Sequence, residues 1–285
     1  MTGEEAEFNR LNATLRVCSD RDALKKPKGF RSPGVADTTS RPEAVFSRMV
    51  ACHSLLYTSQ LRRALTKLSS VDTQMLCEMS RSQSSEESTY MRHFMPNRTG
   101  TFVEIGALDG HQFSNTRVLN ICRGWNGLLI EGNSNNFARL ITRLDRRNVK
   151  LVHSAVCEPP ETWTNFSIDG GPVAVDTSRV SANFQKHWAK FNHPKRTQRV
   201  SCAPMSTLLD GLTHVDFFSL DVEGAEFTVV NTIDFEKTSI DTFCIELDGH
   251  DAEKDERVTK LLENKGYRRC IMRSGKHNGW FRKSC

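Results

Sequence analysis

The feature that most constrains this 285-residue chain is a change of pattern at residue 101. From there on, short and nearly continuous apolar runs alternate with segments of helical periodicity, as expected for parallel strands covered on both faces. The main runs are TFVEIG, GLLIE, VKLVHSAV, VDFFSLD and TFCIEL, and WTNFSI is expected to add a further strand. Two closing runs, YRRCIM and GWFRKS, lie close together, which favours an antiparallel hairpin at the edge. The sequence therefore predicts an α/β fold with a mostly parallel sheet.

The first hundred residues do not share this pattern. Residues 1–41 contain KKPKG, RSPG and TTSRP with few apolar side chains, so we expect a flexible lead. Residues 42–81 repeat apolar positions near helical spacing, with Pro42 suited to a first helical turn. We therefore expect a helical extension that precedes the α/β domain.

Charge and hydropathy exclude several classes of partner. The chain has 39 Lys and Arg against 34 Asp and Glu, a net charge of +5. This excess is too small for a dedicated nucleic-acid binder, so no nucleic acid is expected as a partner. No apolar run approaches the roughly 18 residues of a membrane-spanning helix, and the polar start MTGEEAEFNR is unlike a secretory signal peptide. We expect a soluble intracellular protein.

Cysteines and sequons give no positive signal at this point. Nine cysteines are scattered without a C-x-x-C pair, so neither a zinc ribbon nor a thioredoxin-like site is predicted. Buried thiols in a reducing compartment are the simplest expectation. Three N-x-S/T sequons, at Asn12, Asn97 and Asn165, arise readily by chance in a chain rich in Asn, Ser and Thr, so they receive little weight.

The first predicted strand leads into a loop of small residues, Glu104-Ile105-Gly106-Ala107-Leu108-Asp109-Gly110. Glycines between a strand and a helix let the backbone approach a ligand closely, although an ordinary βα turn explains them as well. Ser114 is expected to cap the helix that follows. The dinucleotide fingerprint G-x-G-x-x-G needs glycine where this chain has Glu104, so an NAD-dependent oxidoreductase ranks last.

The second predicted strand also ends in a carboxylate, Glu131, which lies 27 residues after Glu104. Consecutive parallel strands would place both acids at the carboxyl edge of the sheet, where ligands bind in open α/β folds. A carboxylate in this position can accept hydrogen bonds from both hydroxyls of a ribose, whereas a solvated acid is the alternative. Together with the glycines, Glu131 favours a nucleoside site.

A third group of acids, in the segment Asp221-Val222-Glu223-Gly224-Ala225-Glu226, follows the strand VDFFSLD. Acids so close together are costly unless they are solvated or used. Asp221 is a candidate general base and, with Glu223, a candidate ligand for a hard cation such as Mg²⁺, while Glu226 is expected to cap the next helix. The following strand ends in Glu246, Asp248 and His250. His250 is a second candidate base, against the commoner role of a solvated loop histidine; no metal ligand is assigned.

These motifs, in their order, resemble the FkbM-like S-adenosylmethionine-dependent methyltransferases. The matching segments are FVEIGALDG, SNT, GLLIEGN, HSAV, VDFFSLDVEGAE and CIEL, and SNT and FSLDVEGAE are most similar to the animal Star-like branch. The resemblance runs from about Ser82 to Arg282, so residues 82–285 are expected to form the methyltransferase domain. It implies a Rossmann-like seven-stranded sheet with a reversed final strand.

The resemblance also implies S-adenosylmethionine as cofactor and a role for each matching residue. The cofactor-binding residues would be, from the methionine end to the adenine end, Asp221, Glu104, Gly106, Ala107, Gly110, Glu131, Ser154 and Ala155. Asp221 and Glu223 would face the transferring methyl group. The implied reaction is an in-line attack by an acceptor oxygen on the sulfonium methyl, helped by positioning and proton removal.

Two departures from the family pattern concern catalysis. Many bacterial members have a lysine where this chain has Ser219, and a proline where it has Gly132-Asn133. The Star-like branch shares the serine and includes proteins of secretory-pathway trafficking. We therefore predict O-methylation of a small or carbohydrate-like acceptor. A catalytically silent interaction or trafficking module, and a location in the secretory-pathway lumen, are the alternatives.

Overall fold

The computed structural model describes residues 80–143, 145–168, 171–172, 174–179, 196–247, 249, 251–272 and 278–285. All of them belong to one compact unit, Ser70–Cys285. The expected flexible lead, nearly all of the expected helical extension and the candidate base His250 lie outside the described residues. Within the described ranges, no helix is both long enough and apolar enough to cross a membrane.

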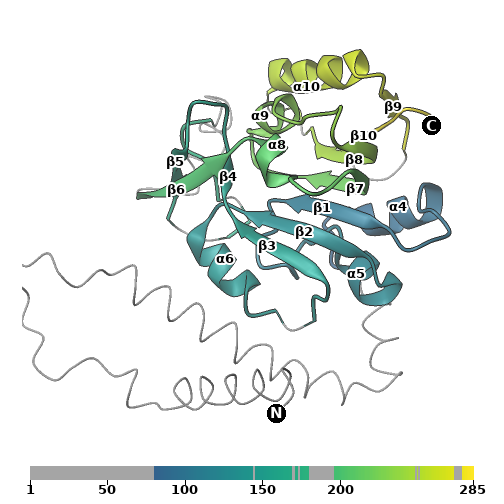
Figure 1. Cartoon of the computed structure of the whole chain (residues 1–285), viewed down its shortest axis with the longest axis horizontal. Coiled ribbons are helices and arrows are strands. Elements are labelled where there is room, and N and C mark those ends of the chain that lie inside the picture. Colours follow the sequence, from purple (N-terminus) through teal and green to yellow (C-terminus); the bar gives the residue numbers. More distant parts are fainter. Residues whose placement is uncertain are drawn as a thin grey trace, which may run out of the picture. The chain divides into compact units, whose positions relative to one another are not determined.

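Strands and helices alternate along much of the described chain, as the apolar runs predict, with β3 to β6 and β9 to β10 as runs of strands (Figure 1). The helices are α4 (Glu86–His93), α5 (Arg117–Arg123), α6 (Ser134–Leu140), α8 (Met205–Leu208), α9 (Glu226–Asn231) and α10 (Ala252–Asn264). The strands are β1 (Thr101–Ile105), β2 (Asn126–Glu131), β3 (Val149–His153), β4 (Ala155–Val156), β5 (Trp163–Ser167), β6 (Thr197–Ala203), β7 (His214–Leu220), β8 (Ser239–Glu246), β9 (Arg268–Cys270) and β10 (Asn278–Arg282).

Seven strands form one sheet in the order β3-β2-β1-β7-β8-β10-β9. The five strands β3, β2, β1, β7 and β8 are parallel to one another. β10 runs antiparallel to both β8 and β9. The predicted mostly parallel sheet with a reversed final strand is therefore confirmed. The chain order reverses between β1 and β7, and open α/β sheets bind ligands outside the carboxyl ends of the strands at such a point.

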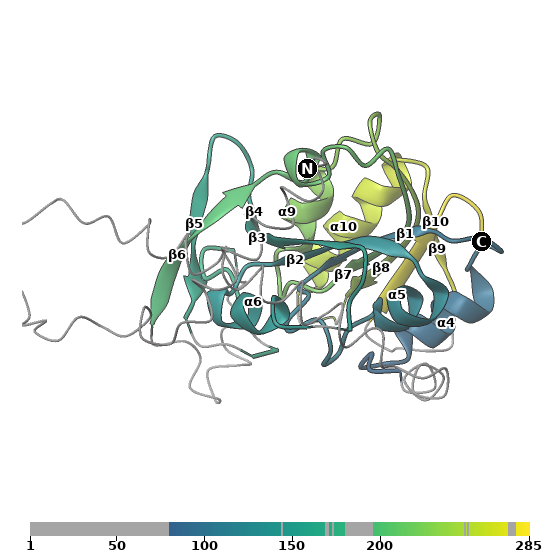
Figure 2. The same cartoon turned by 60° about the horizontal axis from the view of Figure 1, so that its bottom comes forward.

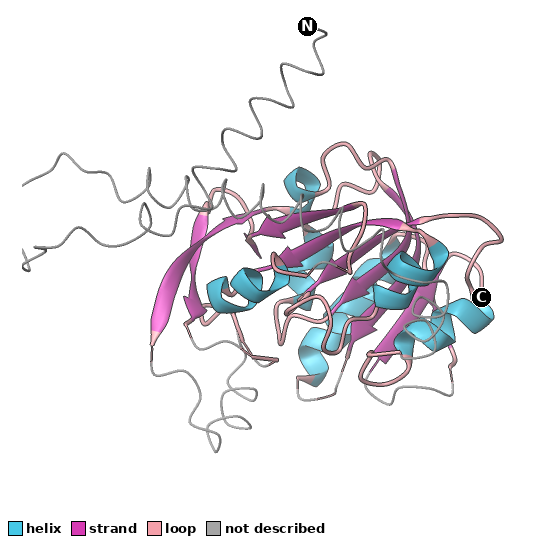
Figure 3. Ribbon diagram, turned by 90° about the horizontal axis from the view of Figure 1, so that it is seen from below, coloured by secondary structure: helices cyan, strands magenta, loops and turns pink. Residues whose placement is uncertain are grey.

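Helices cover both faces of this sheet (Figure 3). Val103 of β1 belongs to one apolar cluster, which includes side chains of α8, α9 and α10. Its neighbour Phe102 belongs to a second cluster, with side chains of α4, α5 and α6. Because successive residues of a strand point to opposite faces and both faces are buried, β1 is apolar on both sides until it reaches Glu104.

A second sheet of three strands, in the order β4-β6-β5, lies beside the β3 end of the main sheet (Figures 1 and 2). The sequence predicts one strand over residues 149–156, but the structure divides it at Ser154. β3 stays in the main sheet, and β4 pairs with β6. The apolar pattern predicts β5 but neither β6 nor α4, because polar residues dominate the last two.

The described cysteines differ from the expectation of free thiols. Cys157 forms a disulfide with Cys202 of β6, and Cys270 of β9 forms another with Cys285. Cys122 is disulfide-bonded as well. Among the described residues only Cys244 is a free, buried thiol. The expectation of buried thiols was therefore wrong for the other five, because distant segments that meet in the fold leave no mark in cysteine spacing.

Candidate functional site

A cavity of about 410 Å³ lies at the carboxyl ends of β1, β2 and β7, within the usual volume range of small-molecule sites. Its wall combines the main sheet with β4 and β5 of the second sheet. The structure brings most of the predicted site residues to this wall, namely Glu104, Gly106, Glu131, Ser154, Ala155, Asp221 and Glu223, together with Glu246. The parallel strands therefore gather at one edge the acids that the sequence distributes over more than a hundred residues.

In the glycine loop after β1, the backbone packs closely against neighbouring atoms at two positions, Gly106 and Gly110. Gly106 has a φ of +81°, and a Cβ there would lie 1.8 Å from the carbonyl oxygen of Asp221. Gly110 has a φ of +71°, and a Cβ would lie 2.5 Å from Cδ1 of Leu140 in α6. Both positions need glycine, because L side chains rarely adopt such φ values and no space is left. Gly110 and the core residue Ala107 are not on the cavity wall, so their contact with a cofactor stays a prediction.

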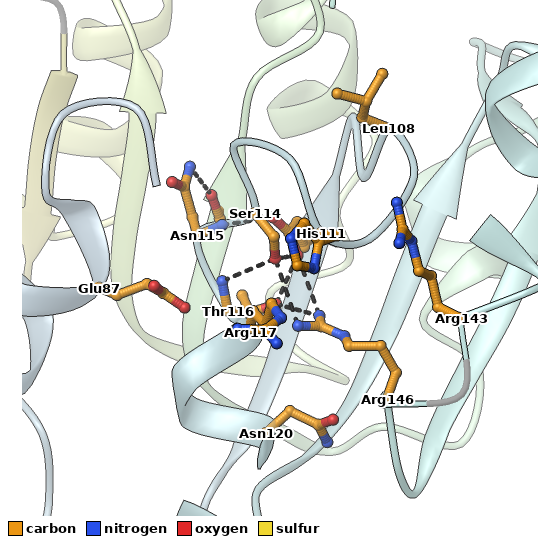
Figure 4. Close-up of polar contacts among 12 residues, drawn as sticks. Glu87, Leu108, His111, Ser114, Asn115, Thr116, Arg117, Asn120, Arg143 and Arg146 are labelled. Carbon is orange, nitrogen blue, oxygen red and sulfur yellow. Dashed lines mark hydrogen bonds and ion pairs between the residues drawn. The ribbon is translucent and has the colours of Figure 1, made fainter. Parts of the chain in front are cut away.

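The carboxylate of Glu104 is the centre of a buried hydrogen-bond network. Figure 4 labels its partners Ser114, Asn115, Thr116 and Arg146. One oxygen accepts the backbone N–H of Asn115 at 2.7 Å, and the other accepts the hydroxyls of Ser114 and Thr116 at 2.9 and 2.5 Å. The guanidinium of Arg146 forms an ion pair with Glu104 at 3.4 Å. Ser114 therefore does not cap α5 as expected, since Thr116 is the N-cap residue. Glu104 instead fixes the path of the loop.

Arg146 and Glu87 complete this network, and neither is identified from the sequence. Arg146 is buried, and burial lowers the pKa of its guanidinium while the nearby charges of Glu104 and Glu87 oppose that shift. Glu87 of α4 accepts the backbone N–H of Val118 at 2.6 Å, and burial raises its pKa to about 7. Both residues tie α4 and the segment after α6 to the loop that frames the cavity.

Glu131 ends β2 as predicted, and its carboxylate is buried against the backbone of two loops. One oxygen accepts the N–H of Leu108 at 2.8 Å, and the other accepts the N–H of Asn133 at 2.7 Å. Burial raises the pKa of Glu131 to about 7 in spite of these hydrogen bonds. A carboxylate oxygen can accept two hydrogen bonds. The side-chain amide of Asn136 donates to this carboxylate as well, so Glu131 keeps room for one more hydrogen bond from a ligand in the cavity.

Beyond Glu131, the wall is formed where β3 gives way to β4. Ser154 and Ala155 line the cavity there, as the family resemblance implies. The N–H of Ser154 donates to the carbonyl oxygen of Glu131 at 3.2 Å, which fixes this segment next to β2. Phe166 of β5 faces Gly132, where a Cβ would lie 2.6 Å from the ring. This end of the cavity is therefore narrow and largely apolar.

Three carboxylates, those of Asp221, Glu223 and Glu246, line the opposite end of the cavity. Each offers an oxygen within 4.8 Å of the others. Asp221 and Glu246 share a hydrogen bond, and burial raises the pKa of both. The negative charge of Asp221 raises the pKa of Glu246 further, so Glu246 holds the proton and donates it to Asp221. Acids in this arrangement are candidate ligands for a divalent cation, but no metal ligand is assigned to them.

Of the remaining acids in this region, the structure describes Glu226 but not Asp248. Glu226, the first residue of α9, accepts the N–H of Gly224 at 3.0 Å and pairs with Nζ of Lys254 at 2.7 Å. Glu226 therefore places its charge in the first turn of α9, as the helix dipole favours, although the N-cap residue is Ala225. Asp248 and His250 lie outside the described residues, so the role of His250 as a base stays a prediction.

Three further wall residues were not assigned from the sequence. Ser219, which replaces the lysine of many family members, accepts a hydrogen bond from Nδ2 of Asn115 at 3.0 Å. Phe113 lies on the wall with 39% of its surface exposed and a φ of +60°. Such a φ is rare for a bulky residue, and a backbone bridge to Ser82 holds it there. Asn115 belongs to the SNT segment and Ser219 to the VDFFSLDVEGAE segment, so these two motifs were the sequence signals nearest to the wall residues.

Comparison with known proteins identifies the family of the domain. Residues 104–269, more than half of the chain, match the model of the methyltransferase FkbM domain. No curated protein matches the chain.

Three solved structures are similar to it at low identity. Methyltransferase FkbM from Methylobacillus flagellatus KT is 13% identical, with a TM-score of 0.42; the match covers 97% of this chain and 60% of that one. Precorrin-6y C5,15-methyltransferase from Geobacter metallireducens GS-15 is 11% identical, with a TM-score of 0.39 and coverage of 68% and 84%. SAH-bound methyltransferase PaMTH1 from Podospora anserina is 10% identical, with a TM-score of 0.39 and coverage of 87% and 99%. By the match of its domain, the chain belongs to the FkbM methyltransferase family.

Proposed function

We propose that this protein transfers a methyl group from S-adenosylmethionine to an oxygen of a small or carbohydrate-like acceptor. The observation that carries the proposal is Glu131, a buried carboxylate at the carboxyl end of β2 that lines the cavity. Leu108, Asn133 and the side chain of Asn136 already donate to it, and the acceptor capacity that is left suits a hydroxyl of a ribose. Membership of the FkbM methyltransferase family supports the same reaction.

The wall on either side of Glu131 fits the other parts of this cofactor. Ser154, Ala155 and Phe166 form the narrow, largely apolar end, which suits a planar heterocycle such as adenine. Gly106 lines the other side, proposed for the methionine part, where the absence of a side chain lets the loop after β1 pack against the backbone of Asp221. Both oxygens of Glu104 already accept hydrogen bonds from the loop. Glu104 therefore acts in the proposal mainly by holding that loop in place.

The acids at the other end of the cavity suit the chemical step. When bound, the cofactor supplies an electrophilic methyl group on a positively charged sulfur. Asp221 and Glu223 place negative charge on the wall that such a group would face. Burial makes Asp221 more basic than an exposed aspartate, while the proton held by Glu246 keeps Asp221 ionised. We assign Asp221 to remove the proton of the acceptor hydroxyl as the methyl group transfers.

The acceptor would enter beside Phe113. Its half-exposed ring lies on the same wall as the amide side chains of Gln83 and Gln112. An aromatic face beside groups that both donate and accept hydrogen bonds suits the apolar face and the hydroxyls of a sugar. The strained φ of Phe113 supports a role in function, because residues with strained backbone cluster at functional sites.

Methyl transfer from S-adenosylmethionine with a labelled methyl group tests this proposal. A panel of monosaccharides, oligosaccharides and small polyols would serve as acceptors. On an acceptor that reacts, Asp221→Asn should lower turnover by about 10²–10⁴-fold, the usual contribution of a general base, while the exposed Asp210→Asn should not. Wild-type turnover by Asp221→Asn would show that the base is another group. Cofactor binding without transfer to any acceptor would support the silent interaction module instead, and loss of turnover with a chelator would support Mg²⁺.

We also propose that the protein works in an oxidising compartment, in place of the reducing interior expected at first. Five of the six cysteines in the described part of the chain are disulfide-bonded. Disulfides persist in secreted and lumenal proteins and are rare where glutathione keeps thiols reduced. This supports the secretory-pathway lumen, the alternative location. Alkylation of the endogenous protein before reduction should label at most Cys244 among these six.

A further inference from the structure

The described residues include two sequons. Unlike most other described asparagines, the asparagines of these sequons make no side-chain hydrogen bond to another described residue. Asn97 begins the sequon Asn97-Arg98-Thr99, and Asn165 begins Asn165-Phe166-Ser167. Both asparagines are exposed, and neither side-chain amide is hydrogen-bonded to another described residue. Most other described asparagines use their amides, namely Asn115, Asn120, Asn133, Asn135, Asn136, Asn231 and Asn278. A modification at Asn97 or Asn165 would therefore break no contact.

Both sequons also point away from the cavity. Asn97 precedes β1, whereas the cavity lies at the carboxyl end of that strand. Five strand residues at about 3.3 Å each separate the two by roughly 17 Å. Asn165 lies in β5, where its neighbour Phe166 lines the cavity. Because successive strand residues face opposite sides, Asn165 faces solvent. A bulky group on either side chain would leave the cavity free.

β5 offers room for such a group. It is an edge strand of the three-stranded sheet, paired only with β6 among the described strands. At Asn165 the backbone carbonyl oxygen is already used, since it accepts the N–H and the hydroxyl of Thr177 at 2.8 and 2.9 Å. The side chain alone remains available, and it projects from the exposed side of the strand.

We propose that Asn97 and Asn165 carry N-linked oligosaccharides. The proposal combines the two exposed, unengaged sequons with the disulfides, because an oxidising secretory compartment also holds the donor, a lipid-diphosphate-linked oligosaccharide. A transferase of the cell that produces the protein joins Nδ2 of the asparagine to the anomeric carbon of the sugar. The bond from that carbon to the diphosphate oxygen breaks, the lipid diphosphate leaves with the electron pair, and the amide loses one proton. The chain itself contributes the acceptor amides.

The endogenous full-length protein, isolated from the cells that produce it, provides the test. Peptide N-glycosidase F in ¹⁸O-water converts each glycosylated asparagine into an ¹⁸O-labelled aspartate. Peptide mapping is expected to find the label at Asn97 and Asn165. Recovery of both peptides with unmodified asparagine would overturn the proposal, and a label at one position only would overturn it for the other.

Variants of the full chain, re-expressed in the same cells, separate the sequon from the asparagine itself. Thr99→Ala should remove the glycan at Asn97, whereas Thr99→Ser keeps the sequon and should retain it. Asn165→Gln should lose one glycan, and Asn126→Gln, at an exposed asparagine outside any sequon, should lose none. A Thr99→Ala protein with the wild-type glycan mass would contradict the assignment of Asn97.

Discussion

Two groups of acids line the same cavity, and they differ in how their negative charge is compensated. Glu104 is surrounded by hydroxyl and backbone donors and forms an ion pair with the buried Arg146. Asp221 and Glu246, at the ends of β7 and β8, have no lysine or arginine partner among the described residues and share a proton instead. The first group is held in place by hydrogen bonds and an ion pair. The second can gain or lose a proton.

This difference separates the frame of the site from its chemistry. Breaking a buried ion pair by removing one partner is strongly destabilising, so the Glu104 group should affect folding first. A carboxylate whose pKa is raised by burial is suited to proton transfer near neutral pH, so the Asp221 group should affect turnover first. The predictions below, together with Asp221→Asn, test whether the two roles can be separated.

The largest effect is expected where the two groups meet, at Gly106. Gly106→Ala would place a Cβ 1.8 Å from the carbonyl oxygen of Asp221 at a φ of +81°. We expect a loss of about 5 kcal/mol in the free energy of unfolding, or failure to fold, because backbone on both sides must move. Gly211 is the control: its φ is +84°, but a Cβ at that position would meet no atom within 4 Å.

Urea denaturation measures both glycine variants. Gly211→Ala should lower the free energy of unfolding by only about 1–2 kcal/mol, the cost of a left-handed backbone conformation for a residue with a side chain. Equal losses for the two variants would mean that the contact between the β1 and β7 loops does not require glycine.

The next effect concerns the ion pair itself. Arg146→Met would leave the carboxylate of Glu104 buried without its cation, which should cost about 3–5 kcal/mol in the free energy of unfolding. The adjacent and exposed Arg147→Met controls for the loss of a positive charge in the same segment. Thermal and urea unfolding would measure the stability of the two variants against that of the wild type. If Arg146→Met were as stable as Arg147→Met, the network in Figure 4 would not hold the loop.

The smallest effect is a change in pH dependence at Glu87, whose pKa burial raises from 4.5 to about 7. Between these values the folded protein keeps a proton that the unfolded chain has lost. The free energy of unfolding should therefore fall as pH rises through this window. Glu87→Gln mimics the protonated acid and should remove about 1–3 kcal/mol of this fall.

Urea denaturation at a series of pH values from about 4 to about 8 shows this slope. The exposed Glu253→Gln should leave it as in the wild type. A wild-type slope in Glu87→Gln would contradict the assignment of a raised pKa to that carboxyl.

The sheet was predictable because its information is local. Apolar runs reveal strands that are buried on both faces, and parallel strands place their final residues at one edge. This is why Glu104, Glu131 and Asp221 could be assigned to one site before the fold was known. The glycine at 106 was predictable as a turn, although its contact with the backbone of Asp221 was not.

The parts that could not be predicted depend on contacts between distant segments. Arg146 reaches Glu104 across 42 residues, and nothing in its own segment marks it as buried. Cys157 and Cys202 are 45 residues apart, so their spacing suggests no pairing. The Ser114 hydroxyl has a typical capping position, but Glu104 competes for it in the fold. Each is a case in which tertiary structure decides between local alternatives.

The central claim is that Glu131 holds the ribose of S-adenosylmethionine, and a calorimetric titration tests it most directly. The purified full-length chain should bind S-adenosylmethionine and S-adenosylhomocysteine at one site. Affinity should rise as pH increases through about 7, because the hydroxyls donate to the ionised form of Glu131. Glu131→Gln should weaken binding by about 10–100-fold and abolish that rise, since a hydrogen bond to a charged group contributes about 1.5–3 kcal/mol. The exposed Glu236→Gln should bind as the wild type does. No heat of binding to the wild-type chain, or equal affinity in Glu131→Gln, would contradict the account.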